Sequence, residues 1–525
     1  MFENTLLSAV LWLPLIGAVV LAFFPRRAEG AIRVTALATA LATFALSLLI
    51  LPRFAEGTAA LQLVESREWI PDWGIRYGLA VDGISLWLVL LTTFLTPIVL
   101  LSSWYSIHKW PKEYLISMLA LEFGMIGAFL ATDLILFYVF FELMLIPMYL
   151  IIGVWGGANR IYAAIKFFIF TMAGSLLMLL GILYMGFLYK KQAGALSFAI
   201  ADLYTLSIPM ETQVLLFFAF ALAFAIKVPL FPLHTWLPDA HVEAPTGGSI
   251  ILAGVLLKLG TYGFIRFVLP FFPDATAKWA WLFGLLSVIG IIYGALVAWV
   301  QPDMKKLVAY SSVSHLGFCV LGIFAMTQTS MTGSVLQSLN HGVSTGALFL
   351  LVGVIYDRRH TRQLADFGGL AKVMPVYAVL FVVTALSSVG LPGLNGFVGE
   401  FLILSGSFRT MPRFTIFATA GVILAAIYLL WLVQKVFFGP VTHEENNGLR
   451  DLRWNELAAM IPLIVMMVWM GLFPGAFIRR IDPSVQQLLT VASRGTDRQI
   501  MLAETPAPPL EAPPDAHATE TGAAR

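Results

Sequence analysis

The sequence contains few charged residues for its length. Charged side chains make up 12% of the 525 residues and hydrophobic side chains make up 59%, whereas about 25% of residues are charged in a typical soluble domain. This balance excludes an ordinary soluble enzyme and predicts a protein embedded in a lipid bilayer. The formal net charge of +2 is too small to indicate a nucleic-acid partner.

Cysteine and ligand-binding motifs are also scarce. The single cysteine, Cys319, excludes an intramolecular disulfide and a cluster of thiolate ligands. No GxxxxGK[ST] or GxGxxG pattern occurs, so the sequence does not support nucleotide binding. The polar stretch from His234 to Glu243 matches no standard zinc motif, and we interpret it as a solvated loop or a proton-uptake vestibule on the inner side. We therefore expect neither a metal nor a cofactor on this chain.

Long apolar runs fill most of the chain between Leu6 and Phe477. A membrane-spanning helix needs about 20 apolar residues, and the runs can form about fourteen such helices. They do not alternate as the strands of a membrane β-barrel do. The predicted fold is an all-α polytopic membrane protein. The first run lacks the cation before it and the cleavage site after it that mark a signal peptide, so we expect a retained first helix.

Prolines interrupt two of the apolar runs. Residues 227–232 read KVPLFP, and residues 389–396 read VGLPGLNG. Proline removes an intrahelical hydrogen bond and clashes with the previous turn, so we expect helices seven and twelve to be broken. Each is the fourth helix of a group of five, which predicts two inverted five-helix repeats. Interrupted helices at matching positions in two repeats indicate a transport site.

The predicted organisation has five parts and a defined orientation. The parts are three transmembrane helices with an outward loop (1–113), the first repeat (114–269), the second repeat (270–440), the last transmembrane helix (441–480) and a polar, proline-rich tail that we expect to be disordered (481–525). Basic residues concentrate in loops that follow odd-numbered helices. The positive-inside rule therefore places those loops in the cytoplasm and both termini outside.

Ionisable side chains lie within six of the apolar runs, where a charge costs about 2.5–3.5 kcal/mol on insertion scales. They are Glu142, Lys227, Lys258, His315, His341 and Glu400, and Glu122 is a weaker candidate. Because acids and bases are distributed over several mid-membrane segments, the pattern suggests a path for protons.

The first three candidates have structural alternatives. Glu142 and Lys227 form an ion pair if their helices touch, and such a pair either transfers protons or only holds the helices together. Burial opposes the charged forms and pairing favours them, so a Lys227 that alternates between two settings changes its proton affinity. Lys258 has no acid on its own helix, and we expect it to receive a proton from Lys227 through water. Arg266, two turns from Lys258, is expected to extend toward the outer surface.

The remaining candidates are also open to more than one interpretation. His315 and His341 are proton carriers, hydrogen-bonded core histidines or haem ligands, although the sequence has no other haem signal. Glu400 is a candidate for proton exit, or a cap of the second half of the broken helix, because carboxylates favour helix N-termini.

Seven short stretches carry a family resemblance. They are VDGIS (81–85), FELMLIP (141–147), KVP (227–229), WLPDAH (236–241), LLK (256–258), SHLG (314–317) and GLPG (390–393). Together they resemble the antiporter-like membrane subunits of respiratory complex I, to which subunits of Mrp-type cation/proton antiporters are related. The resemblance covers about residues 82–454. Most relatives have lysine at the position of Glu400, whereas the middle one of the three complex I subunits has glutamate.

The resemblance implies a proton-pumping module of NADH:quinone oxidoreductase. It implies an input pair (Glu142 and Lys227), a central relay (Lys258), an extension of the row (His315 and His341) and an output (Glu400), with Glu122 less firmly included. It also implies that NADH, FMN, iron–sulfur clusters and quinone bind partner subunits. The expected partners are the lipid bilayer and other membrane subunits, including neighbouring antiporter-like ones, in the bacterial cytoplasmic membrane.

Two other functions fit the same residues. The first is an Mrp-type or hydrogenase-linked antiporter subunit that works with Na⁺. The second is a membrane scaffold whose buried charges only orient helices. Normal pumping by variants without these charges would favour the scaffold, and sodium-dependent activity would favour the antiporter.

Overall fold

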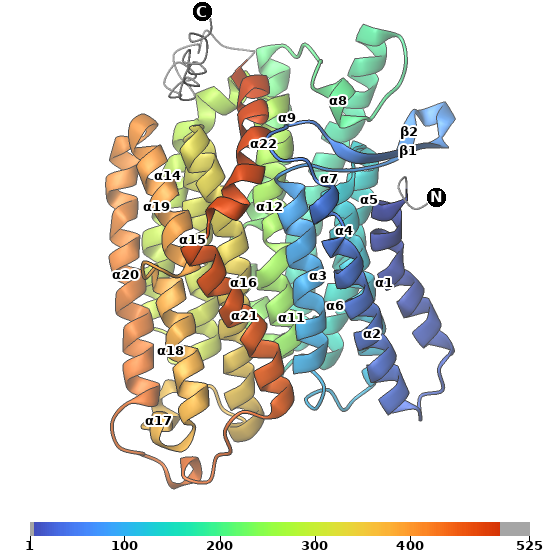
Figure 1. The fold of residues 1–525 in the computed structure, drawn as a ribbon. Helices are drawn as coiled ribbons and strands as arrows, with labels where there is room; N and C mark the ends of the chain where they lie inside the picture. Colours follow the sequence, from blue (N-terminus) through green and yellow to red (C-terminus); the bar gives the residue numbers. More distant parts are fainter. Residues whose placement is uncertain (1–4, 494–525) are drawn as a thin grey trace, which may run out of the picture.

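The computed structural model describes residues 5–493, which form a bundle of long helices standing side by side (Figure 1). Thirteen described helices are long and apolar enough to cross a membrane. A further segment consists of the shorter apolar helix α18 (Pro375–Val389), which α19 (Asn395–Thr410) continues. Helices predominate because a membrane offers no water to satisfy backbone polar groups. The predicted all-α polytopic membrane fold is confirmed.

The N-terminal part contains three spanning helices and an unpredicted β-hairpin. Its elements are α1 (Leu6–Phe23), α2 (Glu29–Leu48), η1 (Leu51–Arg53), β1 (Gln62–Ile70), η2 (Pro71–Trp73), β2 (Ile75–Val81) and α3 (Ser85–Ser102). The two strands pair antiparallel. The carboxylate of Glu65 in β1 accepts hydrogen bonds from the backbone N–H groups of Leu7 (2.8 Å) and Ser8 (3.2 Å). The hairpin thereby satisfies free donors in the first turn of α1.

The middle part contains the first broken segment. Its elements are α4 (Pro111–Leu130), α5 (Leu134–Leu143), α6 (Leu145–Trp155), α7 (Arg160–Ala193), α8 (Ile200–Leu203), α9 (Met210–Lys227), α10 (Trp236–Glu243), α11 (Thr246–Ile251), η3 (Leu252–Leu256), α12 (Lys258–Gly263), η4 (Phe264–Val268) and α13 (Leu269–Phe271). The predicted break is confirmed, because α9 ends at Lys227 and helix resumes only at Trp236. The next segment has two π-helical turns, η3 and η4, on either side of Lys258. Such turns often mark functional sites.

The C-terminal part contains the second broken segment. Its elements are α14 (Pro273–Trp299), α15 (Met304–Phe324), α16 (Gln328–Arg359), η5 (Leu364–Asp366), α17 (Leu370–Val373), α18, α19, α20 (Pro412–Phe437), η6 (Glu444–Asn446), α21 (Trp454–Leu472) and α22 (Gly475–Ser493). Helix α18 ends at Gly390, whose φ of 88° lies in the left-handed region that favours glycine. The predicted break is confirmed. The segment starts near α17, whereas α9 starts at the opposite end of the bundle (Figure 1), so the two broken segments run in opposite directions.

The boundary predicted for the C-terminal tail is wrong. Residues 481–493 belong to helix α22 rather than to a disordered tail. This helix is amphipathic and buries Phe477, Ile481, Val485 and Leu488, a spacing that places them on one face. Its polar residues obscured that pattern in the sequence. Residues 494–525, which carry the proline-rich part of the predicted tail, lie outside the described residues.

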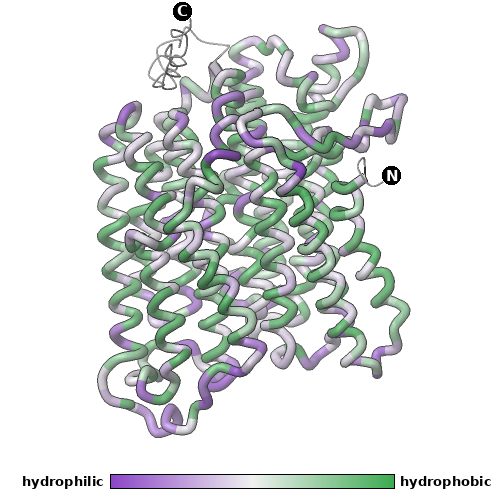
Figure 2. Tube along the Cα trace, viewed as in Figure 1, coloured by the Kyte–Doolittle hydropathy of each residue, from purple (hydrophilic) through white to green (hydrophobic). Residues whose placement is uncertain are grey.

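The basic loops lie together at one end of the bundle. The guanidinium of Arg33 donates to the carbonyl of Ile107 (2.7 Å), and the indole N–H of Trp155 donates to the carbonyl of Lys109 (2.6 Å). Hydrophobic residues predominate along the middle of the bundle, with hydrophilic residues concentrated toward its two ends (Figure 2). These contacts join loops that the sequence predicts to share one side of the membrane, and the orientation itself stays a prediction.

A buried ion pair joins α16 to α21 near that end. Two nitrogens of Arg358 donate to the two carboxylate oxygens of Glu456 at 2.8 and 2.7 Å, and both side chains are less than a tenth exposed. Glu456→Ala leaves the guanidinium buried without its counter-ion, so we expect a loss of about 3–5 kcal/mol of stability. Thermal unfolding of the detergent-purified protein measures this loss.

The matched control for Glu456→Ala is Glu445→Ala. The Glu445 carboxylate is 66% exposed and lies 4.0 Å from Arg359, so its removal should change stability by at most about 1 kcal/mol. Equal effects of the two substitutions would contradict the assignment of Arg358 and Glu456 as a stabilising pair.

Candidate functional site

The six main candidate residues lie on six different helices. They are Glu142 on α5, Lys227 on α9, Lys258 on α12, His315 on α15, His341 on α16 and Glu400 on α19. Five are buried, with at most 4% of each residue exposed, and Glu142 is half-buried. The structure connects four of them in two hydrogen-bonded pairs.

The first pair joins Lys258 to His341. The Nζ atom of Lys258 lies 2.7 Å from Nδ1 of His341, and it also donates to the carbonyl of Ala253 in η3. An ammonium group can only donate, so a charged Lys258 requires a neutral His341 that accepts at Nδ1. Two nitrogen bases that share one hydrogen bond can exchange one proton. The pair can therefore pass a proton from α12 to α16.

The second pair joins His315 to Glu400. Nδ1 of His315 lies 2.8 Å from Oε1 of Glu400, and the Gln337 side-chain amide donates to the same oxygen at 3.0 Å. The hydroxyl of Tyr428 lies 3.2 Å from the other ring nitrogen, Nε2. A His315 that donates from Nδ1 to the carboxylate accepts from Tyr428 at Nε2. These contacts fix both the ring and the carboxylate.

The two histidines bring the pairs together. Their ring centroids are 6.2 Å apart, and Nε2 of His341 has no hydrogen-bond partner within residues 5–493. Water molecules readily bridge polar groups that are too far apart for a direct hydrogen bond. The spatial order is therefore Lys258, His341, His315 and Glu400, which differs from the order in the sequence.

Glu142 and Lys227 do not form the direct ion pair expected from the sequence. In the described part of the chain, Nζ of Lys227 has no hydrogen-bond partner. It lies 4.9 Å from the ring centroid of Phe141 and 5.9 Å from that of Phe167, where aromatic rings attract a cation. Lys227 thus lies among aromatic rings instead of in a direct ion pair with Glu142.

Helix α12 packs closely against the break that follows Lys227. A Cβ atom on Gly260 would lie 2.7 Å from the backbone nitrogen of Val228 and 2.8 Å from the carbonyl oxygen of Phe224. Only glycine fits such an approach without a backbone shift. Gly260 is two residues after Lys258, and Val228 directly follows Lys227. The two lysines therefore project from backbones that touch.

Glu122 is buried on α4 without a hydrogen-bonded connection to the row. It is fully buried, and neither carboxylate oxygen has a hydrogen-bond partner among the described residues. Burial of a carboxyl group without a hydrogen bond is costly. Glu122 thus remains a secondary candidate.

The segment from His234 to Glu243 is not a solvated loop. Most of it forms helix α10, and both His234 and His241 are buried. At its edge, the Asp239 carboxylate forms an ion pair with Lys166 of α7 at 2.7 Å. Tryptophan, leucine and valine between the polar residues allow the segment to fold inward as a short helix. Within residues 5–493 no group of three or more His, Cys, Asp or Glu side chains is arranged to hold a metal ion.

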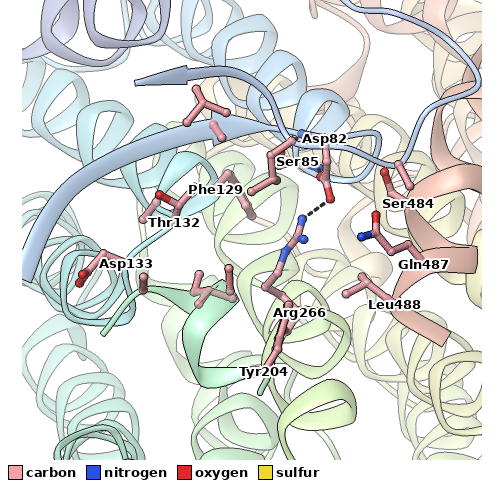
Figure 3. A pocket seen from close by; sticks show the side chains of 18 of the residues that line it. Asp82, Ser85, Phe129, Thr132, Asp133, Tyr204, Arg266, Ser484, Gln487 and Leu488 are labelled. Carbon is pink, nitrogen blue, oxygen red and sulfur yellow. Dashed lines mark hydrogen bonds and ion pairs between the residues drawn. The ribbon is translucent and has the colours of Figure 1, made fainter. Parts of the chain in front are cut away.

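The sequence did not indicate the partner of Arg266. Rather than extending toward the surface, Arg266 is buried and forms an ion pair with Asp82 at 2.5 Å (Figure 3). Burial raises the pKa of Asp82, but the guanidinium and the hydrogen bonds from Ser85 outweigh burial and hold the pKa below its usual value. Asp82 belongs to the stretch VDGIS. Nothing in the sequence around Asp82 or around Arg266 indicates that these two residues pair.

The fold and the buried row of titratable groups define a polytopic membrane protein of the ion-translocating class. Residues 131–427 match the family described as NADH:quinone oxidoreductase/Mrp antiporter, transmembrane. The chain belongs to this family.

Individual relatives match nearly the whole chain. The chain is 47% identical to NADH-quinone oxidoreductase subunit M of Rhodobacter capsulatus over 93% of this chain and 96% of the relative. It is 44% identical to NADH-ubiquinone oxidoreductase chain 4 of Marchantia polymorpha, over 92% and 97% of the two chains. A chain of respiratory complex I from Thermus thermophilus has a TM-score of 0.84 and 33% identity, with coverage of 93% and 99%. A chain of the Mrp complex from a Dietzia species shares the fold, with a TM-score of 0.78 and 21% identity over 94% and 99%.

Proposed function

We propose that this chain is the M-type proton-translocating membrane subunit of an NADH:quinone oxidoreductase. The observation that carries the proposal is the buried row in which Lys258 contacts His341 and His315 contacts Glu400. Intramembrane ionisable groups are costly and usually functional, and in this chain they are arranged as neighbours that can exchange protons. The names of the relatives at 44–47% identity support the same assignment.

The redox reaction takes place in other subunits. NADH, FMN, iron–sulfur clusters and quinone bind there, and the energy reaches this chain through neighbouring membrane subunits, including other antiporter-like ones. Glu142 is half-buried, so a charge on a neighbouring subunit can act on it directly. Moving one charge against 100 mV needs about 2.3 kcal/mol. A change of a few kcal/mol in the electrostatic free energy at Glu142 and Lys227 is therefore large enough to drive the transfer.

The order of groups gives the direction of transfer. A change near Glu142 destabilises the proton on Lys227, which moves to Lys258 through water. The proton then passes to His341, from there to His315, and to Glu400. We infer that the chain lies in the bacterial cytoplasmic membrane, with the basic loops in the cytoplasm and both termini on the periplasmic side.

Substitution of the input residues tests this function. We expect Lys227→Ala and Glu142→Ala to reduce NADH-driven proton pumping to about a tenth or less, because each removes a proton-transfer or charge-coupling step. Pumping is measured as acidification inside inverted membrane vesicles, and assembly is checked by the amount of intact complex. Wild-type pumping by assembled variants would refute the role. Dependence of transport on Na⁺ would favour a cation/proton antiporter instead.

A further inference from the structure

A cavity of about 300 Å³ opens at the end of the bundle opposite the basic loops (Figure 3). It lies between the β-hairpin, α8, α22 and η4, and its lining includes Asp82, Ser85, Tyr204, Tyr262 and Arg266. In the orientation proposed above, this end faces the periplasm. The cavity can therefore admit water and protons from the side toward which protons are pumped.

The cavity reaches close to the central relay. Lys258 and Tyr262 are four residues apart in α12, which places them on one face of the helix, and Arg266 follows in the π-helical turn η4. Tyr262 lines the cavity, and Nε of Arg266 donates to its hydroxyl at 3.3 Å. One helical turn of about 5.4 Å separates the Tyr262 position from that of Lys258. An open path here would let protons flow back to Lys258 without passing Glu400.

The ion pair occupies this path. The guanidinium of Arg266 stays charged at all ordinary pH values, and Asp82 holds it through Oδ2. The other oxygen of Asp82 accepts from the backbone N–H groups of Ile84 (3.1 Å) and Ser85 (2.9 Å) at the start of α3. The cation therefore has a fixed position on the rigid framework. A fixed arginine in a narrow passage repels protons and other cations.

We propose that Arg266 is an electrostatic barrier that prevents protons in the outer cavity from reaching Lys258. The inference rests on the proposed function of Lys258 as a relay. Arg266 acts as a positioning and insulating residue, and it takes no part in the transfer itself. Its positive charge is the essential property, whereas the ion pair serves to hold that charge in place.

Two variants separate the charge from the ion pair. Asp82→Asn removes the pair but keeps the arginine cation and an oxygen that can cap α3. The double variant D82N/R266Q also removes the cation, and its two amides leave no buried charge unpaired. The complete complex is reconstituted in liposomes, and passive proton leak is measured under an imposed pH gradient without NADH. We expect D82N/R266Q to leak at least ~10-fold faster than D82N, because D82N keeps the cation near the path although Asp82 no longer fixes its position, and a nearby charge changes a barrier by this much or more.

The single variants Arg266→Lys and Arg266→Gln make the same comparison with Asp82 intact. Lysine retains a cation and should keep the leak near the wild-type rate, whereas glutamine should raise it. The leak should return to the wild-type rate when Lys258→Met is added to the leaking variant. Equal leak in D82N and D82N/R266Q, or a leak that persists without Lys258, would overturn the barrier.

The outcome is distinguishable from a failure of the proposed function. If Lys258→Met alone leaves pumping intact, then the relay assignment is wrong, and the barrier has nothing to protect. If Lys258→Met stops pumping while D82N/R266Q does not leak, then the relay stands and only the barrier is refuted.

Discussion

Replacement of Lys258 by methionine is expected to reduce proton pumping at least ~100-fold while the complex still assembles. Lys258 contacts His341 on α16 and lies on a helix whose backbone touches that of α9 after Lys227. In the proposed mechanism it is therefore the residue through which a proton from Lys227 reaches the row of histidines. Methionine fills a similar volume and leaves no charge to bury, so the fold should tolerate it. Pumping per NADH oxidised, measured in inverted vesicles, checks the result.

The informative control is Lys258→Arg. Arginine keeps a positive charge near His341 but does not release its proton at accessible pH. If Lys258 carries protons, Lys258→Arg should fail as completely as Lys258→Met. If Lys258 only supplies a fixed charge, Lys258→Arg should pump and Lys258→Met should not. The pair of variants thus distinguishes a relay from a structural cation.

The fold was predictable from sequence because the membrane constrains it strongly. A chain with long apolar runs can only form helices or closed barrels in a bilayer, and the runs do not alternate. The breaks at Lys227 and Gly390 were predictable because proline and glycine act locally. The amphipathic α22 was missed because its apolar residues are spaced among polar ones. The hairpin that holds Glu65 against α1 was missed because its pairing is set by tertiary contacts.

The members of the site were predictable, but their contacts were not. Each ionisable residue in an apolar run is conspicuous by its cost alone. Which residue touches which depends on how six helices pack. Sequence order places His315 before His341, yet His341 contacts Lys258 and His315 contacts Glu400. The same limit applies to Asp82 and Arg266, which are separated by a large part of the chain and meet only in the folded bundle.

The final transfer step predicts a strong effect of Glu400→Gln. Glutamine retains the size of glutamate and can still hydrogen bond to His315 and Gln337, but it cannot take up and release a proton. We expect assembly to be preserved and pumping to fall at least ~100-fold, because transfer from His315 then has no acceptor. The measurement is again acidification of inverted vesicles per NADH oxidised.

Gln337→Leu provides the matched comparison for Glu400→Gln. It removes the 3.0 Å hydrogen bond to Oε1 of Glu400 but leaves the carboxylate and the His315 contact in place. The substitution therefore removes one contact of the carboxylate but keeps the group that exchanges the proton. Gln337→Leu should therefore slow pumping less than Glu400→Gln does. If Glu400→Gln pumps normally while Lys258→Met does not, protons leave the row before α19. Tyr428, whose hydroxyl contacts Nε2 of His315, is then the next residue to substitute.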